Sequence, residues 1–551
     1  MATVAEFIAD FLYKNGITDI FMLSGGGAIH LDQAVENHKG LRAICIKNEA
    51  TGPMMAKAYA QLKNNFGVVY VTTGPGGANA VTGVVECFVD SSPVLIISGQ
   101  APLMQTTKYA NINGLRSFGV QELNIIDVVT PITKYARMIT NPAYLLHELQ
   151  KAIAIAKEPR PGPVWLDIPL DIQSAELNEN TLTWEYEPIK ETHDASLYKV
   201  DLLIDELRKS LRPLIVAGQG IRISGAIEQL KELAQTIDAP IIFSRMGLDT
   251  IPFSYKYNMG IGGFKGSKYN KQIMKEADLI ISIGTSLSVA FAGHNLSFFN
   301  ENAKVFMIDI EEAEANKFVR RLTSFDKCDA KLFINKLLQR LYERKSVLGN
   351  PQWMTWCTDL KEKYHAHKLA EKKNPIDIYY LVKSIDRVST ENDVFVDDAG
   401  SIYYVASQTL TFEKGQREVT SGAFASMGNA IPLAIGCAIA NPNIRVLAMT
   451  GDGSLETNIQ ELKTLSYYEL NVKLFVINNG GYISMRDHGR HVVGEQNGVV
   501  SLNKIADAYG MPYLLIHDYQ QLKNLDELIS IPGPQFIEVL CDNNQKLILP
   551  V

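Results

Sequence analysis

Short apolar runs alternate with stretches of helical periodicity along most of the chain, which has 551 residues. A short apolar run that ends at glycine or polar residues is typical of a buried strand in a parallel sheet. Strands that are separated by helices in this way form α/β domains. In the first part of the chain the pattern predicts strands at residues 19–23, 43–46, 68–72, 94–98 and 164–168.

The alternation begins again twice after this first part. A polar stretch at residues 174–196 is predicted to be a linker. We predict three tandem doubly wound α/β domains with parallel sheets, at residues 1–173, 190–340 and 370–551. The later strands are expected near residues 212–217 and at 240–244, 278–284, 305–309, 394–397, 446–449, 472–477 and 534–540.

The charged stretch after Leu337 is predicted to be a solvated connector between the second and third domains. It contains the sequence His365-Ala366-His367, which we do not expect to bind a metal because few aspartates surround it.

Composition narrows the class of protein. A net charge of −7 and an isoelectric point near 5.9 give no reason to expect nucleic-acid binding. The six cysteines are scattered without a CxxC pair, so neither a disulfide framework nor a zinc site is indicated. The sequence has no apolar run of 18 residues, and its first residues form an amphipathic pattern without the basic start of a signal peptide. We therefore expect a cytoplasmic protein without membrane partners.

Two predicted strands of the third domain end in polar, glycine-rich segments. Gly451-Asp452-Gly453 follows one strand, and Asn478-Asn479-Gly480-Gly481 follows the next. Because the carboxyl ends of parallel strands meet at one edge of the sheet, we expect Asp452 and Asn479 to lie close together. The crossover between these strands is predicted to be a helix with a capped start, from the apolar and capping positions Asn458, Ile459, Glu461, Leu462 and Leu465.

One carboxylate and one amide oxygen are poor ligands for zinc but suit Mg²⁺ that is held against a diphosphate. Taken alone, Gly451-Asp452-Gly453 is more often an ordinary turn with a surface acid. The combination of both segments at adjoining strand ends favours the metal site.

The segments GDGS, QEL and NN, with Asn479 twenty-seven residues after Asp452, resemble the thiamine-diphosphate signature of the acetolactate synthase and pyruvate oxidase superfamily. The resemblance implies that thiamine diphosphate and Mg²⁺ are cofactors. It implies a pyrimidine-binding, a central and a diphosphate-binding domain in that order. It also implies that Asp452, the Asn479 side chain and the Gly481 carbonyl bind the metal, and that the cofactor contacts Gly453, Ser454, Tyr482 and Ile483.

Glu49 is the expected acid in the first domain. It follows a predicted strand and precedes an alanine-rich helix, a position where a glutamate is usually a cap. The segment resembles the family's HEQGA motif, except that Asn48 replaces the usual histidine. The resemblance implies that Glu49 protonates the aminopyrimidine ring of the cofactor, which makes the neighbouring amino group a base.

Other loops resemble the family's cofactor and substrate loops. Thr72 to Asn79 resembles a TGPGxxN loop, and Gly25-Gly26-Gly27-Ala28 resembles a GGA loop near the reacting carbon. His30 is either a proton shuttle or, more safely, a structural histidine, and Gln121 stands in a segment that resembles an FQE loop. Further cofactor contacts are implied at Pro75, Asn79, Ala399, Gly400, Ser401, the Ala425 carbonyl and Met427, which occupies the place of a wedge beneath the bent cofactor.

Glu49 and Met427 belong to different predicted domains. The family resolves this separation by building each site between two subunits, which implies a homodimer or a homotetramer.

The resemblance implies a carboligase that decarboxylates a 2-oxo acid, with pyruvate expected, and transfers the acyl carbanion to a carbonyl acceptor. Two departures from acetolactate synthases favour another acceptor, since Ser286 stands where the family has an arginine and residues 485–488 replace the segment with its tryptophan. The segments SGGGAIHLDQAV, GTSLS and NNGGYISMR resemble more closely the related enzymes of sugar and polysaccharide pathways. A keto sugar is therefore considered as the acceptor. FAD, which the family binds in the central domain, stays open because the loop around Ser286 differs.

Two alternatives remain at this point. The first is a decarboxylase that protonates the intermediate and releases an aldehyde. The second is a paralogue that keeps the fold without catalysis, against which the presence of Glu49, Asp452 and Asn479 argues.

Overall fold

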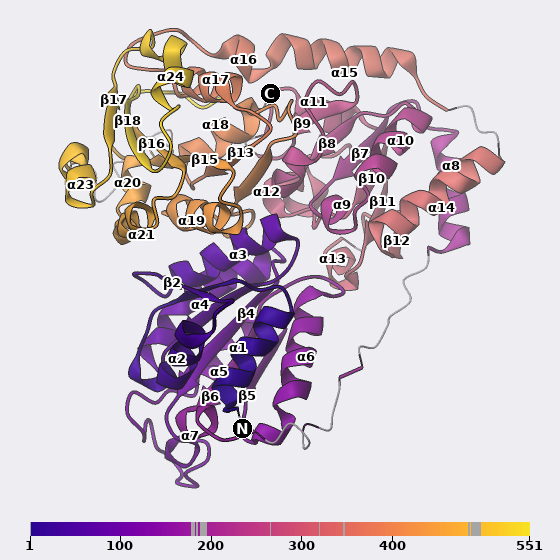
Figure 1. Ribbon diagram of the computed structural model, residues 1–551. Coiled ribbons are helices and arrows are strands. Elements are labelled where there is room, and N and C mark those ends of the chain that lie inside the picture. The colour runs from indigo at the N-terminus through magenta and orange to yellow at the C-terminus, as the bar shows by residue number, and fades with distance from the viewer. Residues whose placement is uncertain are drawn as a thin grey trace.

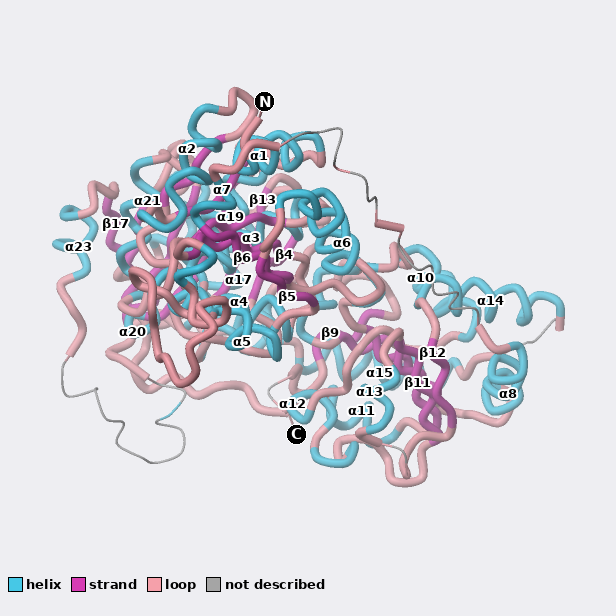
Figure 2. Tube along the Cα trace, turned by 90° about the horizontal axis from the view of Figure 1, so that it is seen from below, coloured by secondary structure: helices cyan, strands magenta, loops and turns pink. Residues whose placement is uncertain are grey.

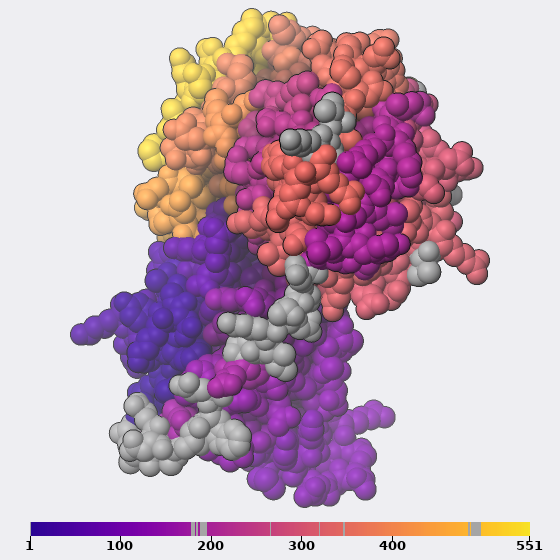
Figure 3. All heavy atoms as spheres, turned by 90° about the vertical axis from the view of Figure 1, so that its right-hand side faces the viewer, coloured from indigo at the N-terminus to yellow at the C-terminus, as the bar shows by residue number. Residues whose placement is uncertain are grey.

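The computed structural model describes residues 2–177, 182, 186–187, 195–264, 266–318, 320–344, 348–482, 485 and 498–550. Figure 1 shows three α/β domains, with the first below and the central and third side by side above it. Figure 2 views the molecule from the side of the first domain, so the third domain lies behind the first and the central domain extends to one side. Figure 3 shows the first domain beneath the other two from a third direction.

The described residues form three six-stranded sheets, and every pairing between named strands is parallel. This confirms the predicted fold class. Numbered within each domain, the first and third sheets share the strand order 2-1-3-4-6-5, whereas the central sheet has the order 3-2-1-4-5-6. Each order contains a point between two neighbouring strands from which the chain continues toward opposite sides of the sheet, and ligands of open α/β sheets bind outside the strand ends there.

In the first sheet the order reverses between β1 and β3. Its strands are β1 (Asp19–Met22), β2 (Arg42–Cys45), β3 (Gly67–Val71), β4 (Val94–Gln100), β5 (Tyr135–Met138) and β6 (Val164–Pro169). Its helices are α1 (Val4–Lys14), α2 (Ile29–Asn37), α3 (Thr51–Lys63), α4 (Pro75–Val89), α5 (Ile125–Val129), α6 (Leu145–Lys157) and α7 (Leu170–Gln173).

In the central sheet the order reverses between β7 and β10. Its strands are β7 (Pro213–Ala217), β8 (Ile241–Phe243), β9 (Asn258–Ile261), β10 (Leu279–Ile283), β11 (Lys304–Asp309) and β12 (Ser324–Lys327). Its helices are α8 (Leu197–Leu207), α9 (Gly220–Ile223), α10 (Ile227–Ile237), α11 (Asn270–Glu276), α12 (Val289–Ala292), α13 (Glu312–Asn316) and α14 (Ala330–Glu343).

In the third sheet the order reverses between β13 and β15. Its strands are β13 (Asp393–Asp397), β14 (Arg417–Thr420), β15 (Arg445–Gly451), β16 (Val472–Asn478), β17 (Tyr513–Ile516) and β18 (Gln535–Leu540). Its helices are α17 (Ile378–Val388), α18 (Ser401–Thr409), α19 (Ala430–Ala440), α20 (Asp452–Leu455), α21 (Leu462–Tyr467), α23 (Leu502–Ala508) and α24 (Leu525–Leu528).

The first and third domains pack through α3 and α19, which adjoin in Figure 1. Every residue of α19 is buried, and a methyl group added at Gly436 would lie 2.1 Å from the Met55 carbonyl oxygen. The two helix backbones are therefore in direct contact. Apolar residues of both helices belong to one continuous core, so the two domains are joined by burial as well as by the chain.

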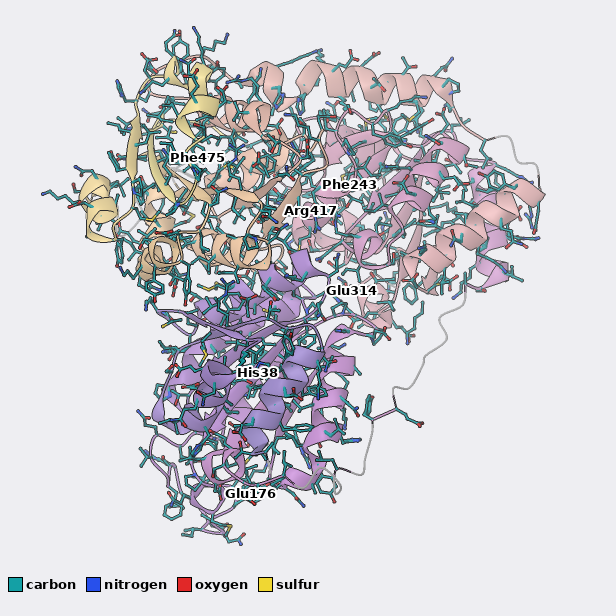
Figure 4. The ribbon with its side chains drawn as sticks, in the orientation of Figure 1. His38, Glu176, Phe243, Glu314, Arg417 and Phe475 are labelled. Atoms are coloured by element: carbon teal, nitrogen blue, oxygen red, sulfur yellow. The ribbon has the colours of Figure 1, made fainter. Side chains whose placement is uncertain are left out.

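Ion pairs mark the other domain borders. Arg417 donates to Asp249 at 2.8 Å between the third and central domains, and Arg160 donates to Glu314 at 3.1 Å between the first and central domains. Figure 4 places the labelled Arg417 and Glu314 at these two borders.

The interior strands were predicted, but several edge strands were not. The missed edge strands β5, β12 and β17 each have a single buried residue out of four. The edge strands β9 and β14 were also missed, although nearly all of their residues are buried. The domain limits at residues 1–173, 190–340 and 370–551 stay predictions. Among the described helices, none is long and apolar enough to cross a membrane.

The stretch that was predicted to be a charged helical connector is helical, but it is only partly solvated. The stretch forms α15 (Pro351–Tyr364) and α16 (Ala366–Leu369), which lie along the upper edge of the molecule in Figure 1. Trp353, Met354 and Cys357 of α15 are buried. The His365 ring is 9% exposed and stacks on Phe253 with ring centroids 4.2 Å apart. The connector is thus packed against the central domain.

His365 gives a test of this packing. Burial, with nearby cations adding to it, lowers the pKa of His365 from 6.5 to about 3. The unfolded chain therefore binds more protons than the folded one below pH 6.5, and the free energy of unfolding falls as the pH falls. We expect wild type to lose stability relative to His365→Gln by up to about 1.4 kcal/mol per pH unit in this range. Urea unfolding measured from pH 7 to 4 checks this, with His294→Gln at an exposed site as the control. Parallel pH profiles for wild type and His365→Gln would contradict it.

Candidate functional site

The carboxylate of Asp452 joins two strand ends of the third sheet. Asp452 follows β15, and its Oδ2 accepts hydrogen bonds from the backbone N–H groups of Asn479, Gly480 and Gly481 at 2.8–3.1 Å. These residues follow β16, and Gly480 and Gly481 have φ values of 75° and 113° that turn their N–H groups toward the acid. Burial raises the pKa of Asp452, although the backbone donors oppose this effect. The predicted proximity of Asp452 and Asn479 is confirmed.

The side chain of Asn479 presents an unpaired oxygen. Its Oδ1 is buried and has no hydrogen-bond partner among the described residues. A buried polar atom without a partner is unusual and calls for a ligand or ion. The described residues contain no group of three His, Cys, Asp or Glu side chains that could hold a metal ion, so an ion at this edge would need amide or backbone oxygens as further ligands. A carboxylate next to a free amide oxygen fits Mg²⁺.

Asp398 holds three segments around this edge. It is fully buried after β13, and its carboxylate accepts from Ala399 N and Gly428 N, each at 2.8 Å, and from Thr450 Oγ1 at 2.8 Å. Burial raises its pKa to about 6. The three donors lie in the turn after β13, before α19 and in β15, so a single buried acid fixes the relative positions of all three.

Residues 425–428, which include Met427 at the predicted wedge position, form the wedge loop. This loop lies beside Asp398. Ala425 has a φ of 48°, in the left-handed region that residues with side chains seldom adopt, and Met427 is half-buried. Asn458 Nδ2 donates to the Gly428 carbonyl at 2.9 Å. The loop is therefore held at its end by Asp398 and Asn458.

The other third-domain residues that were predicted to contact the cofactor lie at the same edge of the sheet. Ala399 and Gly400 form the turn after β13, Ser401 begins α18, and Gly453 and Ser454 lie in α20. A methyl group added at Gly453 would lie 2.9 Å from the Tyr482 ring, so this ring covers Gly453. Ile483 lies outside the described residues, as do residues 486–488 of the segment that was compared with the family's tryptophan segment.

Glu49 lies in the first domain between β2 and α3 and is 8% exposed. Its Oε2 accepts a hydrogen bond from Asn79 Nδ2 at 3.0 Å. Asn79 lies in α4, which begins at Pro75. Glu49 therefore lies beside the helix that follows the TGPG segment.

The other site residues that were predicted in the first domain lie near the reversal point of its sheet. A methyl group added at Gly74 would lie 2.0 Å from the Gln121 carbonyl oxygen, which places the Gln121 backbone against the loop after β3. Gly27 N donates to Thr72 Oγ1 at 3.2 Å, so the loop containing Gly26 adjoins the same segment. His30 lies in the first turn of α2 and is half-buried.

The central domain offers a cavity of about 200 Å³ at its own strand ends. Gly220, Ser286 and Asp309 line it together with Arg160 of the first domain. The Ser286 carbonyl accepts a hydrogen bond from Lys317 Nζ at 2.5 Å.

Comparison with protein families assigns all three domains. Residues 2–120 match the N-terminal TPP binding domain of thiamine pyrophosphate enzymes, residues 200–337 match their central domain, and residues 398–539 match their C-terminal TPP binding domain. The chain belongs to the thiamine pyrophosphate enzyme family. The family that the sequence motifs indicated and the prediction of a cofactor-dependent enzyme are both confirmed.

The enzyme is similar to large subunits of acetolactate synthase along nearly its whole length. It is 29% identical to that of Lactococcus lactis subsp. lactis (strain IL1403), with 99% of this chain and 93% of the relative covered. It is 27% identical to acetolactate synthase isozyme 1 of Escherichia coli (strain K12), with 99% and 95% covered. It is 29% identical to a probable large subunit of Methanocaldococcus jannaschii, with 98% and 92% covered.

The role of Glu461 in this thiamine pyrophosphate enzyme could not be recognised from the sequence. A helix follows Asp452 as predicted, but neither Asn458 nor Glu461 caps it through a side-chain hydrogen bond. Glu461 is fully buried, and its Oε1 accepts from Lys47 N at 2.9 Å, Asn48 N at 3.1 Å and Thr51 Oγ1 at 2.9 Å. A third-domain acid therefore holds the loop that carries Glu49.

Removal of the Glu461 carboxylate tests this contact. Glu461→Ala leaves the backbone N–H groups of Lys47 and Asn48 without their acceptor, at roughly 1–3 kcal/mol for each buried group that stays unpaired. The Thr51 hydroxyl keeps the Asn48 carbonyl as an acceptor at 2.6 Å. We expect the free energy of unfolding to fall by at least about 2 kcal/mol, measured by urea denaturation. Glu456→Ala in the same segment changes an exposed side chain and is expected to stay within about 0.5 kcal/mol of wild type. Equal stability of the two variants would show that the contact does not hold the loop.

Proposed function

We propose that this enzyme decarboxylates a 2-oxo acid, with pyruvate the expected donor, and transfers the acyl unit to a carbonyl acceptor. The observation that carries the proposal is the buried Glu49 paired with Asn79 at the reversal point of the first sheet. The end-to-end similarity to acetolactate synthase large subunits supports the carboligase class.

Mg²⁺ is the proposed metal, held by Asp452, the Asn479 side chain and the Gly481 carbonyl. The free Oδ1 of Asn479 supports this assignment because it already lies in the dry interior with no other partner among the described residues. Metal and diphosphate would face the ends of β15 and β16, where Gly453 and Ser454 also lie. Ala399, Gly400, Ser401, Tyr482 and Ile483 are proposed to complete the cofactor contacts.

Thiamine diphosphate, when bound, supplies an electron sink that no side chain offers. Glu49 is proposed to hold a proton at its carboxylate against the aminopyrimidine, where the low exposure of the carboxylate excludes water. Pro75 and Asn79 are proposed to flank the pyrimidine ring of the cofactor. Asn79 also keeps the Glu49 carboxylate oriented through its hydrogen bond to Oε2. The Ala425 carbonyl is proposed to accept from the cofactor's amino group, and Met427 to support the bent conformation.

Gly26, Gln121 and His30 are proposed to border the substrate. Their elements meet the segment containing Pro75 at one edge of the first sheet. Ser286 and the changes at residues 485–488 support an acceptor other than a second 2-oxo acid, with a keto sugar as the proposed class. Release of an aldehyde without ligation is the alternative.

A homodimer or homotetramer is part of the proposal. Glu49 and Asp452 lie in separate domains, and both oxygens of the Asp452 carboxylate accept hydrogen bonds within the third domain. Apolar side chains that would suit a partner surface lie exposed in the segment before Gln121, namely Met104, Ile112, Phe118 and Val120. The first domain of one chain is proposed to meet the third domain of another across this surface.

FAD stays a prediction of the family resemblance. The central cavity of about 200 Å³ is small for a dinucleotide, although a groove of about 1170 Å³ adjoins it and shares Gln219 and Ile223. Flavin absorption in the purified protein would establish this cofactor.

The product assay tests the proposed reaction. Protein, thiamine diphosphate, Mg²⁺ and pyruvate are incubated with and without keto-sugar acceptors, and products are identified by mass spectrometry. We expect release of CO₂ with a two-carbon extension of the acceptor. Acetaldehyde as the sole product under every condition would establish the decarboxylase alternative.

The metal assignment predicts a specific loss at Asn479. Asn479→Ala removes the free amide oxygen, and we expect the Mg²⁺ requirement for cofactor binding to rise more than about tenfold, since even residues outside the metal's ligand sphere contribute about 10–100-fold. Cofactor binding is followed by calorimetry over a range of Mg²⁺ concentrations. Asn478→Ala is the matched control, because Asn478 donates instead to Glu538 at 2.7 Å. An unchanged Mg²⁺ dependence in Asn479→Ala would contradict the assignment.

A further inference from the structure

Lys57 is a fully buried cation in the interface between the first and third domains. It lies in α3, and its Nζ donates to Glu86 Oε1 at 3.0 Å, Asp90 Oδ2 at 2.6 Å and the Thr420 carbonyl at 3.1 Å. These partners use all three donors of the ammonium group. Burial alone would lower the pKa of Lys57, but the charges of Asp90 and Glu86 raise it above its ordinary value. Lys57 is therefore charged at neutral pH.

The two acids extend this network into the third domain. Asp90 Oδ2 accepts from Gly422 N and its Oδ1 from Ala423 N, each at 2.8 Å. Glu86 Oε2 accepts from Ser426 Oγ at 3.1 Å. Every third-domain contact of the network thus falls within residues 420–426, and three of the four are with backbone atoms.

Residues 420–426 lead directly into the wedge loop. Ala425 adopts its left-handed conformation inside this stretch, where its N–H donates to Ser421 Oγ at 2.8 Å. Such a conformation persists only where the surroundings fix it. The far end at Gly428 is held by Asp398 and Asn458. The near end is held from the first domain.

We propose that Lys57, Glu86 and Asp90 are positioning residues that set the backbone path of Ala425 to Met427 against the cofactor. The inference rests on the proposed function, because it takes the cofactor contacts of Ala425 and Met427 from there. Hydrogen bonds to the carboxylates fix the N–H groups of Gly422 and Ala423, and the ammonium group fixes the Thr420 carbonyl. Lys57 neutralises part of the charge that the two buried acids would otherwise leave unpaired.

Asp90→Asn is the decisive variant. It keeps the size of the side chain but replaces one acceptor oxygen by a donor, which faces either the Lys57 ammonium or an N–H group of the loop. Asp386→Asn is the matched control, because Asp386 is a buried acid of the third domain that binds Thr411 and is not a contact of the loop. Both variants carry the same chemical change at a buried acid.

Three measurements on the full-length protein follow the loop and the cofactor separately. Hydrogen exchange by mass spectrometry reports on residues 420–428 without cofactor, and we expect about tenfold faster exchange there in Asp90→Asn than in wild type. Thiamine diphosphate affinity at saturating Mg²⁺ is expected to fall about tenfold, as one charge-assisted hydrogen bond is lost. The exchange rate of the cofactor's C2 proton, measured by NMR at full occupancy, is expected to fall as well. Asp386→Asn should leave all three unchanged even if its melting temperature drops.

A role in stability alone would lower the melting temperature of Asp90→Asn and leave C2 proton exchange at the wild-type rate, which would overturn the inference. If Asp90→Asn does not fold, Ser426→Ala decides, since it removes only the hydroxyl contact to Glu86 and should give smaller changes in the same directions. Unchanged loop exchange and cofactor affinity in that variant would also overturn the inference. Failure of wild type to bind thiamine diphosphate would instead refute the proposed function.

Discussion

The hydrogen bonds to the Asp452 carboxylate fix the edge of the third sheet on which the proposed site depends. They tie the turn after β16 to the end of β15 through three backbone N–H groups. The backbone N–H of Asn479 is bonded to Asp452, and its side-chain oxygen has no partner among the described residues. The turn therefore presents a free amide oxygen of the kind that hard cations prefer.

The first and third sheets have the same strand order, and each has predicted site residues at the ends of strands at or beside its point of reversal. The proposed function assigns the aromatic ring of the cofactor to the edge of the first sheet, beside Glu49, and its diphosphate and metal to the edge of the third. Within one chain, the two domains are joined by α3 against α19, by Glu461 beneath the Glu49 loop and by Lys57 with its acids beneath the wedge loop. These contacts connect the loops of both half-sites through buried, fully bonded polar groups. A displacement of one domain would therefore alter both loops together.

The sequence was sufficient for those features that depend on local pattern. Buried strands appear as apolar runs, and Asp452 and Asn479 could be paired because two parallel strand ends must meet. The edge strand β12 was missed because its sequence, Ser-Phe-Asp-Lys, contains a single apolar residue, whereas β17 was missed although its four residues are apolar. Glu461 was interpreted as a helix cap because its true partners, Lys47 to Thr51, lie more than 400 residues away. Lys57 gave no signal at all, since a lysine within an alanine-rich helix is normally exposed, and only the packing of the third domain buries it.

The central claim is that Glu49 of one chain and Asp452 of another complete each site. It is tested most directly by mixing two inactive variants, Glu49→Gln and Asp452→Asn, by joint refolding or coexpression, and by measuring turnover of pyruvate. If sites form between chains, half of the dimers in an equimolar mixture are hybrids with one intact site, so about a quarter of wild-type activity should return. If each site forms within a single chain, every site in the mixture carries one lesion and activity stays at the level of the separate variants, which would contradict the account.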